Sequence, residues 1–288
     1  LLKDNGLLQL LGDCGWRVEH LPDVMPTTVS NDINSDPSKS LIDVNAKNCA
    51  QVGATSYDVH KQVYEEAKKD NFLLILGGDH CIPIGTISGI VKARPSTGVI
   101  WVDAHADINT PAGSGSGNMH GMPLAFLLGL VENTKNYPSM EWFGDEKTPW
   151  LKPESLVYIG LRDLDSFEKK IIKKLNIKAY TMYDIDRLGI GKIMEEATEY
   201  LNNYENIHLS YDIDALDPVF APHTGTAVKG GLTFREGNYI CENLYNTGKL
   251  TSMELVEVNP SLHPHLDNTK TIQMALSLLG STMGEKIL

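Results

Sequence analysis

The chain has 288 residues, of which 42% are hydrophobic and 22% are charged, and its formal net charge is −12. That length and composition are enough to bury a large core and are typical of one α/β domain. The excess of acids excludes nucleic acid and anionic membranes as principal partners, because both require clustered Lys and Arg, whereas a small cationic substrate is compatible with it.

Nothing in the composition indicates a membrane span or an oxidising compartment. No apolar run approaches the roughly 20 residues that a membrane helix needs. The four cysteines are scattered without a C-x-x-C pair, which argues against a zinc finger or a disulfide framework and favours the cytoplasm. Because the sequence begins at Leu1 within a helix-like stretch, residues 1–13, we expect the natural N-terminus to be missing. The sequence does not decide whether a mitochondrial targeting segment has been removed.

Short, β-rich apolar runs alternate along the chain with longer stretches whose apolar residues recur at helical spacing. We predict strands over residues 71–78, 97–105, 155–162, 177–182, 207–214 and 251–260. The predicted helices after residues 1–13 span 57–70, 165–175, 190–204 and 235–248. This alternation is typical of parallel strands joined by crossover helices. We therefore predict a single α/β domain over residues 1–288, with an irregular surface segment at 21–48 and a flexible loop at 111–118.

Ionisable residues follow five of the predicted strands, in the segments GGDH, DAHAD, RDLD, YDID and EVNP. Open α/β sheets bind ligands at the carboxyl ends of their strands, so these groups would share one edge of the sheet. Each has an ordinary structural explanation: Asp79 as a helix cap, His105 as a hydrogen-bonded core histidine, Glu257 as half of a salt bridge. The YDID acids could likewise begin a turn. Five such strand ends together are harder to explain in that way.

The segment WVDAHADINT, residues 101–110, carries the strongest signal. Alternate side chains of an extended strand share a face, so Asp103, His105 and Asp107 would converge on one small volume. With the other strand ends they predict a two-metal centre whose candidate ligands are His80, Asp103, His105, Asp107, Asp212 and Asp214. Oxygen and imidazole donors without thiolate suit Mn²⁺, and we expect the neighbouring Cys81 to be a packed thiol.

Seven segments resemble the arginases of the ureohydrolase family, in the same order along the chain: GGDHCIPIGTISG, WVDAHADINTP, SGNMHGMP, YIGLRDLDSFE, SYDIDALDP, TGTAVKGGLTFREG and MELVEVNPSL. They extend from about residue 71 to 280 and match six ligand positions at once. The resemblance implies a three-layer α/β/α fold with a mostly parallel central sheet of about eight strands. It also implies a homotrimer, with Arg235 and Glu236 near the subunit contact.

The resemblance further implies two Mn²⁺ ions per subunit. The ligands of one ion would be His80, Asp103, Asp107 and Asp212. The ligands of the other would be Asp103, His105, Asp212 and Asp214, so that Asp103 and Asp212 bridge the two ions. The implied catalytic residues are His120, Glu257 and Asp107. Of these, His120 matches the family's proton-transfer histidine, and Glu257 matches the acid that faces the substrate guanidinium.

The implied substrate is L-arginine, and its amino-acid end would be recognised by residues remote from the metals. Asn109, Ser116 and Asn118 match positions that contact the α-carboxylate, and Ser114 stands where the family often has Thr. Asp165 matches the position that contacts the α-amino group. The remaining positions, which shape the pocket, are Asp163, Glu168 and Thr226. Because residues 111–118 are richer in glycine than usual, ordering this loop costs more entropy and weakens the expected hold on the carboxylate.

A guanidinium is a poor electrophile because its charge is delocalised, and water is a weak nucleophile. Two divalent ions would supply a bridging hydroxide near neutral pH, and His120 would protonate the departing amine. We therefore predict hydrolysis of L-arginine to L-ornithine and urea. Two alternatives stay open, the same reaction on agmatine or another guanidino compound, and a non-catalytic homologue that keeps the fold. His120 could also merely cap the helix that begins near Pro123.

Three further histidines, His223, His263 and His265, are unassigned by the resemblance. We expect all three to be surface loop residues. The H-x-H pair at 263–265 lacks the nearby acids that a third metal would need.

Overall fold

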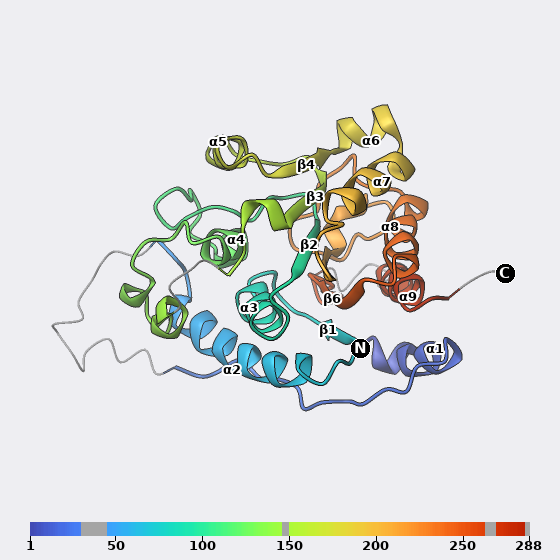
Figure 1. Ribbon diagram of the computed structural model, residues 1–288, viewed down its shortest axis with the longest axis horizontal. Coiled ribbons are helices and arrows are strands. Elements are labelled where there is room, and N and C mark those ends of the chain that lie inside the picture. The colour runs from blue at the N-terminus through green and yellow to red at the C-terminus, as the bar shows by residue number, and fades with distance from the viewer. Residues whose placement is uncertain (30–44, 146–149, 263–268, 286–288) are drawn as a thin grey trace.

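A parallel sheet forms the centre of the computed structural model, which describes residues 1–29, 45–145, 150–262 and 269–285. Its six strands run in the order β1-β6-β5-β2-β3-β4, and every neighbouring pair is parallel (Figure 1). The strands are β1 (Leu73–Leu76), β2 (Thr97–Val102), β3 (Leu156–Leu161), β4 (Lys178–Thr181), β5 (Asn206–Asp212) and β6 (Leu250–Val256). All six predicted strands are thus confirmed, with shorter bounds.

The expected count of about eight strands is wrong for the described residues, which form six. After helix α1 (Leu7–Asp13) the described chain runs without a strand to residue 29, so no strand of the described residues extends the sheet beyond β1. The four-residue strands β1 and β4 are its edges, and both are only partly buried. The interior strands β2 and β3 are buried at every position, as expected for strands covered on both faces.

Helices connect the strands and cover both faces of the sheet. After α1 they are α2 (Cys49–Ala67), α3 (Pro83–Ala93), α4 (Pro123–Leu127), α5 (Ser166–Leu175), α6 (Met182–Leu188), α7 (Ile190–Tyr200), α8 (Phe234–Asn246) and α9 (Thr269–Thr282). The predicted helices 165–175, 190–204 and 235–248 match α5, α7 and α8, and residues 57–70 lie mostly within the longer α2. Among the described helices, none is both long enough and apolar enough to cross a membrane.

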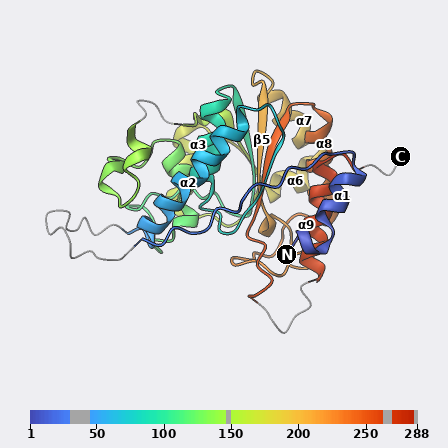
Figure 2. The same cartoon turned by 90° about the horizontal axis from the view of Figure 1, so that it is seen from below.

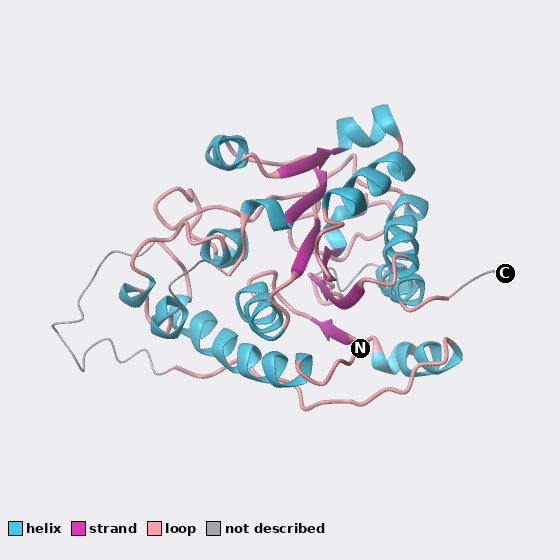
Figure 3. Ribbon diagram, in the orientation of Figure 1, coloured by secondary structure: helices cyan, strands magenta, loops and turns pink. Residues whose placement is uncertain are grey.

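The layers are α/β/α, as predicted. Helices α2 to α5 lie on one side of the sheet, and α1 with α6 to α9 lie on the other (Figures 1 and 2). A hydrophobic core lies on each side of the sheet. Trp101 and Tyr158 belong to the core beneath α2 to α5, whereas Ile100 and Tyr211 belong to the core beneath α1 and α6 to α9. Figure 3 shows the strands enclosed by helices, with loops gathered beyond the strand ends. Helices therefore cover both faces of the sheet, and the residues that follow the carboxyl ends of its strands remain available to form a functional site.

Candidate metal centre and substrate cavity

The predicted ligands come from the carboxyl ends of adjacent strands. His80 follows β1, Asp103 follows β2 directly, and Asp212 is the last residue of β5. Glu257 follows β6, which lies between β1 and β5. Because parallel strands all end at the same edge, four segments that are far apart in the sequence deliver their polar side chains to one place.

His80 lies at the centre of the buried carboxylates. Its Nδ1 atom is 3.1 Å from Asp103 Oδ2, 3.2 Å from Asp107 Oδ2 and 3.1 Å from Asp212 Oδ2. The side chain is almost inaccessible to solvent, and Nδ1 makes no hydrogen bond of acceptable geometry. A buried nitrogen that faces three carboxylate oxygens without bonding to any of them is placed as a ligand would be around a cation.

His105 forms the second half of the cluster. Its Nδ1 atom is 3.4 Å from Asp103 Oδ1 and 3.2 Å from Asp214 Oδ2. The two oxygens of Asp103 therefore face different histidines, Oδ2 towards His80 and Oδ1 towards His105. This is the arrangement required of a carboxylate that bridges two ions.

Polar contacts behind the ligands hold them in place, and the sequence analysis missed them. Ser210 Oγ lies 2.9 Å from Nε2 of His80, and Trp101 Nε1 donates a 2.9 Å hydrogen bond to Asp103 Oδ2. The Trp101 ring also stacks on His80, with 4.1 Å between centroids. Ser210 and Trp101 each stand two residues before a ligand on the same strand. Strand periodicity alone would have placed them beside Asp212 and Asp103.

The backbone is strained at two of the predicted site residues. Asp107 has a φ of 48° and Glu257 a φ of 62°, in the left-handed region that residues other than Gly and Asn rarely adopt. Tertiary hydrogen bonds hold both turns, since Leu124 N donates to Asp107 O and Glu257 N donates to Gly78 O. Such strain persists where the surrounding structure imposes it, and it is enriched at functional sites.

Protonation in the metal-free cluster reflects its crowded negative charge. Burial raises the pKa of Asp107 to about 6, with a further contribution from Asp103. Burial and the neighbouring acids also raise the pKa of Asp212 and of Asp214. Burial alone would lower the pKa of His105, but the carboxylates of Asp103 and Asp214 raise it to about 12. A cluster that retains protons this strongly lacks positive charge, which divalent cations would supply.

A cavity of about 270 Å³ opens directly above these ligands. Its lining includes twelve of the predicted site residues: His80, His105, Asp107, Asn109, Ser114, Ser116, Asn118, His120, Glu168, Asp212, Thr226 and Glu257. Asp103 and Asp214 lie below its floor, in contact with the two histidines. The cavity is therefore lined both by predicted ligands and by predicted amino-acid contacts.

Two of the predicted substrate-binding residues, Asp163 and Asp165, do not line this cavity. Asp163 lies beside it, with Oδ2 3.9 Å from His105 Nε2. Asp165 caps helix α5, where Oδ1 accepts hydrogen bonds from the backbone N–H groups of Phe167 and Glu168. Its other oxygen, Oδ2, accepts a 2.9 Å hydrogen bond from Asn109 Nδ2. The helix cap thus fixes Asp165 next to a residue that does line the cavity.

His120 and Glu257 lie on the cavity wall beside Asp79, which sequence analysis considered only as a cap. His120 Nδ1 is 3.4 Å from Asp79 Oδ2, and this contact raises the pKa of His120. The N-terminus of α4 has no side-chain cap, so His120 does not have the alternative capping role. Glu257 Oε1 accepts a 2.7 Å hydrogen bond from the backbone N–H of His80, which fixes the carboxylate and leaves Oε2 towards Gly225.

Residues 111–118, expected to be a flexible loop, are tied to the segment before α2. Asn45 Nδ2 donates hydrogen bonds to the carbonyl oxygens of Pro111, at 3.2 Å, and Ser114, at 2.6 Å. Within the loop, Ser114 Oγ accepts a hydrogen bond from Gly117 N. These bonds connect the glycine-rich backbone to the segment before α2, and the flexibility expected of this loop stays a prediction.

The other expectations near the site have mixed outcomes. Cys81 is a free, partly buried cysteine, and burial raises its pKa well above the usual value, which agrees with a packed thiol. The expectation for His223 is wrong. Its side chain is fully buried, and its Nδ1 lies 3.3 Å from Thr271 Oγ1 on α9. His263 and His265 lie outside the described residues.

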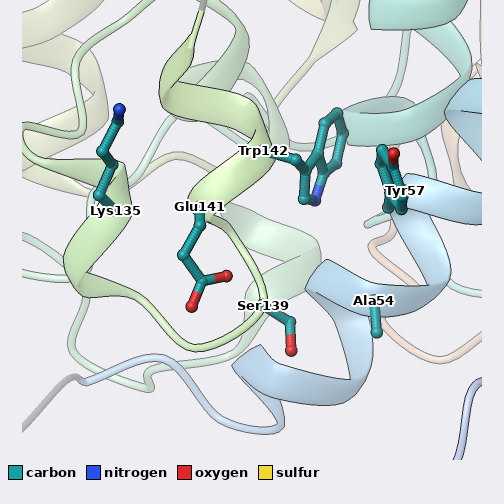
Figure 4. Close-up of a pocket in the computed structure, with 6 residues that line it drawn as sticks. All are labelled: Ala54, Tyr57, Lys135, Ser139, Glu141 and Trp142. Atoms are coloured by element: carbon teal, nitrogen blue, oxygen red, sulfur yellow. The ribbon is translucent and has the colours of Figure 1, made fainter. Parts of the chain in front are cut away.

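A second cavity, of about 560 Å³, lies away from the metal centre (Figure 4). Its lining residues are Ala54, Tyr57, Lys135, Ser139, Glu141 and Trp142. The rings of Tyr57 and Trp142 lie 5.3 Å apart on one side of it. It is larger than the cavity above the ligands, but its lining contains neither a histidine nor a second acid, so we do not assign the chemistry to it.

The fold and the site together place the chain among α/β enzymes in which clustered acids and histidines lie at the carboxyl edge of a parallel sheet. Residues 20–284 match the model of the arginase family. The chain is 44% identical to the arginase of Glaciozyma antarctica over 291 residues, covering 100% of this chain and 82% of that protein. The chain belongs to the arginase family, and it is an enzyme of the hydrolase class.

Solved structures of this family share the fold. A crystal structure of arginase from Bacillus subtilis superposes with a TM-score of 0.88 at 40% identity, covering 100% of this chain and 91% of that one. Entamoeba histolytica arginase in complex with L-ornithine superposes with a TM-score of 0.83 at 30% identity, covering 98% and 89%. The likeness extends over nearly the whole chain, including every strand that contributes to the candidate metal centre.

Proposed function

We propose that the chain hydrolyses the guanidinium group of L-arginine to L-ornithine and urea, with two Mn²⁺ ions bound by the six predicted ligands. The observation that carries this proposal is the position of His80 Nδ1, buried and facing three carboxylate oxygens at 3.1 to 3.2 Å. The relatives named arginase and the Entamoeba structure with bound L-ornithine support the choice of substrate.

The donor set fits manganese. Four carboxylates and two imidazoles without a thiolate provide the oxygen-rich ligation that Mn²⁺ accepts. His80, Asp103, Asp107 and Asp212 would hold one ion; Asp103, His105, Asp212 and Asp214 would hold the other. When bound, the ions supply hydroxide near neutral pH by lowering the pKa of water. Ser210 and Trp101 keep His80 and Asp103 oriented for ligation.

Two side chains on the cavity wall would act on the substrate. Glu257, fixed by its bond from His80 N, presents a carboxylate to the guanidinium and orients the cation over the ligands. His120 would give its proton to the amine nitrogen that leaves as ornithine. Because Asp79 raises the pKa of His120, a larger fraction of this imidazole carries a proton at neutral pH than of an ordinary histidine.

The far end of the cavity would bind the amino-acid group. Asn109, Ser114, Ser116 and Asn118 offer hydrogen bonds to the α-carboxylate. Asp165, fixed at the start of α5, would accept from the α-ammonium. The pocket between these groups and the ligands would be shaped by Asp163, Glu168 and Thr226, and burial raises the pKa of Glu168 to about 7.

Arginine and agmatine share the guanidinium and differ by the α-carboxylate, so comparing them tests the proposal. Neutral hydrogen bonds to a charged group contribute about 1.5 to 3 kcal/mol each, so several of them should favour arginine by at least about 10³-fold in kcat/KM. Urea release by the manganese-loaded chain measures both rates. Equal kcat/KM for the two substrates would replace the arginase proposal with a general guanidino hydrolase. No urea from either would point to a non-catalytic homologue.

We also infer a homotrimer, on the resemblance alone, and a cytoplasmic setting, on the four scattered cysteines. Arg235, which is exposed, pairs in this chain with Glu242 at 2.6 Å. Glu236 belongs to the capping box that begins α8 with Thr233. Both residues lie on the same turn of α8, so a subunit contact there would involve the two together.

A further inference from the structure

Recognition of the α-carboxylate presents an electrostatic problem in this cavity. The proposed carboxylate contacts Asn109, Ser114, Ser116 and Asn118 are neutral. The rest of the lining holds four acids, Asp107, Glu168, Asp212 and Glu257, beside three histidines, and the chain as a whole carries a net charge of −12. A negative carboxylate that enters such a field is repelled. A positive charge near these neutral groups would therefore add to the preference for arginine over agmatine that their hydrogen bonds supply.

The segment that braces loop 111–118 brings a positive charge to this position. Lys47 N donates a 2.7 Å hydrogen bond to the carbonyl oxygen of Gly117, which fixes the Lys47 backbone against the loop. Asn45, two residues earlier, bonds to the same loop through Pro111 and Ser114. Three hydrogen bonds, two from Asn45 and one from Lys47, therefore hold residues 45–47 against the loop just before α2 begins.

The Lys47 side chain reaches the cavity wall. Its Nζ atom donates a 3.2 Å hydrogen bond to Oδ1 of Asn118, a residue that lines the cavity. Because Oδ1 of Asn118 accepts from Lys47, the Nδ2 group of the same amide remains as a donor for a carboxylate. Lys47 therefore contributes both a charge and an oriented amide.

We propose that Lys47 is a specificity-determining residue, which favours substrates that carry an α-carboxylate. This inference rests on the proposed function, because it concerns the amino-acid end of the same cavity. Lys47 is exposed, so solvent screens its charge, and the expected effect is about fivefold in kcat/KM rather than many orders of magnitude. The effect should appear in KM more than in kcat, because Lys47 is remote from the reacting atoms.

The test compares Lys47→Gln with Lys47→Arg on arginine and agmatine. Lys47→Gln should lower kcat/KM for arginine about fivefold and leave agmatine unchanged, while Lys47→Arg should retain the parent values. The difference should diminish in 1 M salt, where charges are screened within about 3 Å. Lys192→Gln is the matched control, since Lys192 is an exposed lysine that pairs with Glu195 on α7, in the opposite helical layer. An equal loss on both substrates, or no loss on either, would overturn the proposal.

Ligand binding separates this inference from the proposed reaction. In the manganese-loaded chain, calorimetry should show weaker binding of L-ornithine by Lys47→Gln and unchanged binding of putrescine, which lacks the carboxylate. This readout needs no turnover. If ornithine binding depended on Lys47 but the chain released no urea, the proposed function alone would be wrong. If the chain hydrolysed arginine normally but the parent and Lys47→Gln bound ornithine equally, the Lys47 inference alone would be wrong.

Discussion

Replacing Asp103 with alanine is expected to lower kcat by at least about 10³-fold and to reduce the manganese content of the chain. The two oxygens of this carboxylate face His80 and His105, so its loss removes a ligand from both proposed ions. Substituting residues that merely support a ligand typically costs 10- to 100-fold in metal affinity or activity, and removing a bridging ligand should cost more. Metal analysis and urea-release kinetics on the same sample measure both effects.

Two variants provide the comparison for Asp103→Ala. Asp214→Ala should be milder, because this carboxylate lies next to one of the two ligand histidines, His105, and would hold one ion rather than two. Asp186→Ala, which removes an exposed acid on α6, should behave like the parent protein. Circular dichroism would establish that each variant is folded. If folded Asp103→Ala kept two manganese ions and near-normal turnover, the bridging assignment would be wrong.

Removing the metals should abolish activity and lower the Tm by about 10 °C. A ligand present at 100 times its Kd stabilises the folded state by about 2.7 kcal/mol, so two such ions together contribute about 5 kcal/mol. For a chain of this size each kcal/mol corresponds to roughly 2 °C or more. Thermal unfolding with and without a chelator measures the difference. A Tm that is insensitive to the chelator would contradict the account.

The loss of stability on chelation should grow with pH. In the metal-free chain the pKa of Asp107 is about 6, above the roughly 3.9 of an unfolded aspartate. The stability this group contributes is complete below about pH 4 and is lost as the pH rises through 6. The pKa of His80 and of His105 is also raised, so the stability that these histidines contribute likewise falls as the pH rises above about 6.5. The pKa of Asp103 is lowered, so the stability that this group contributes rises with pH, but only below about pH 4.

Manganese binding has the reverse dependence, because the ligands must be deprotonated. The Tm of the metal-free chain should therefore fall between pH 5 and pH 8, while the Tm of the loaded chain should change much less. Scans at pH 5, 6, 7 and 8 would show a widening gap. A gap that narrows with rising pH would mean that these buried acids are not the groups that respond to the metal.

Asp103, His105 and Asp107 lie close together as expected, but the reason given for it was wrong, because β2 ends at Val102 and the three residues follow it in a bend rather than in an extended strand. Asp103, His105 and Asp107 follow one buried strand at alternate positions, and the parallel sheet brings Asp212 and Glu257 to the same edge. The strand count taken from the resemblance was wrong for the described chain, because the described residues between α1 and α2 form no further strand beside β1. In this chain the edge strand β1 is only partly buried, whereas the interior strand β2 is buried at every position.

Helices buried on most sides gave no periodic signal. Of α3, the residues from Pro83 to Ile90 are all buried, so no polar face alternates with an apolar one. Helix α9 is buried along much of its length and was missed for the same reason. Amphipathic helices such as α5 and α8, with one exposed face, were predicted near their observed bounds.

Contacts between distant segments were beyond the reach of sequence patterns. Asp79 and His120 are 41 residues apart, and Lys47 and Asn118 are 71 apart. His223 was assigned to the surface from its loop setting, but the packing of α9 buries it against Thr271. In each case the neighbour is determined by how the layers pack, which residue spacing does not encode.

The central claim is that two manganese ions held by His80, His105 and four aspartates enable hydrolysis of arginine. The most direct measurement titrates the metal-free chain with Mn²⁺ and follows bound metal and urea release from L-arginine in the same sample. The account predicts that activity rises until two ions are bound per chain and that ornithine and urea form in equal amounts. Full activity at one ion per chain, or binding of two ions without urea release, would contradict it.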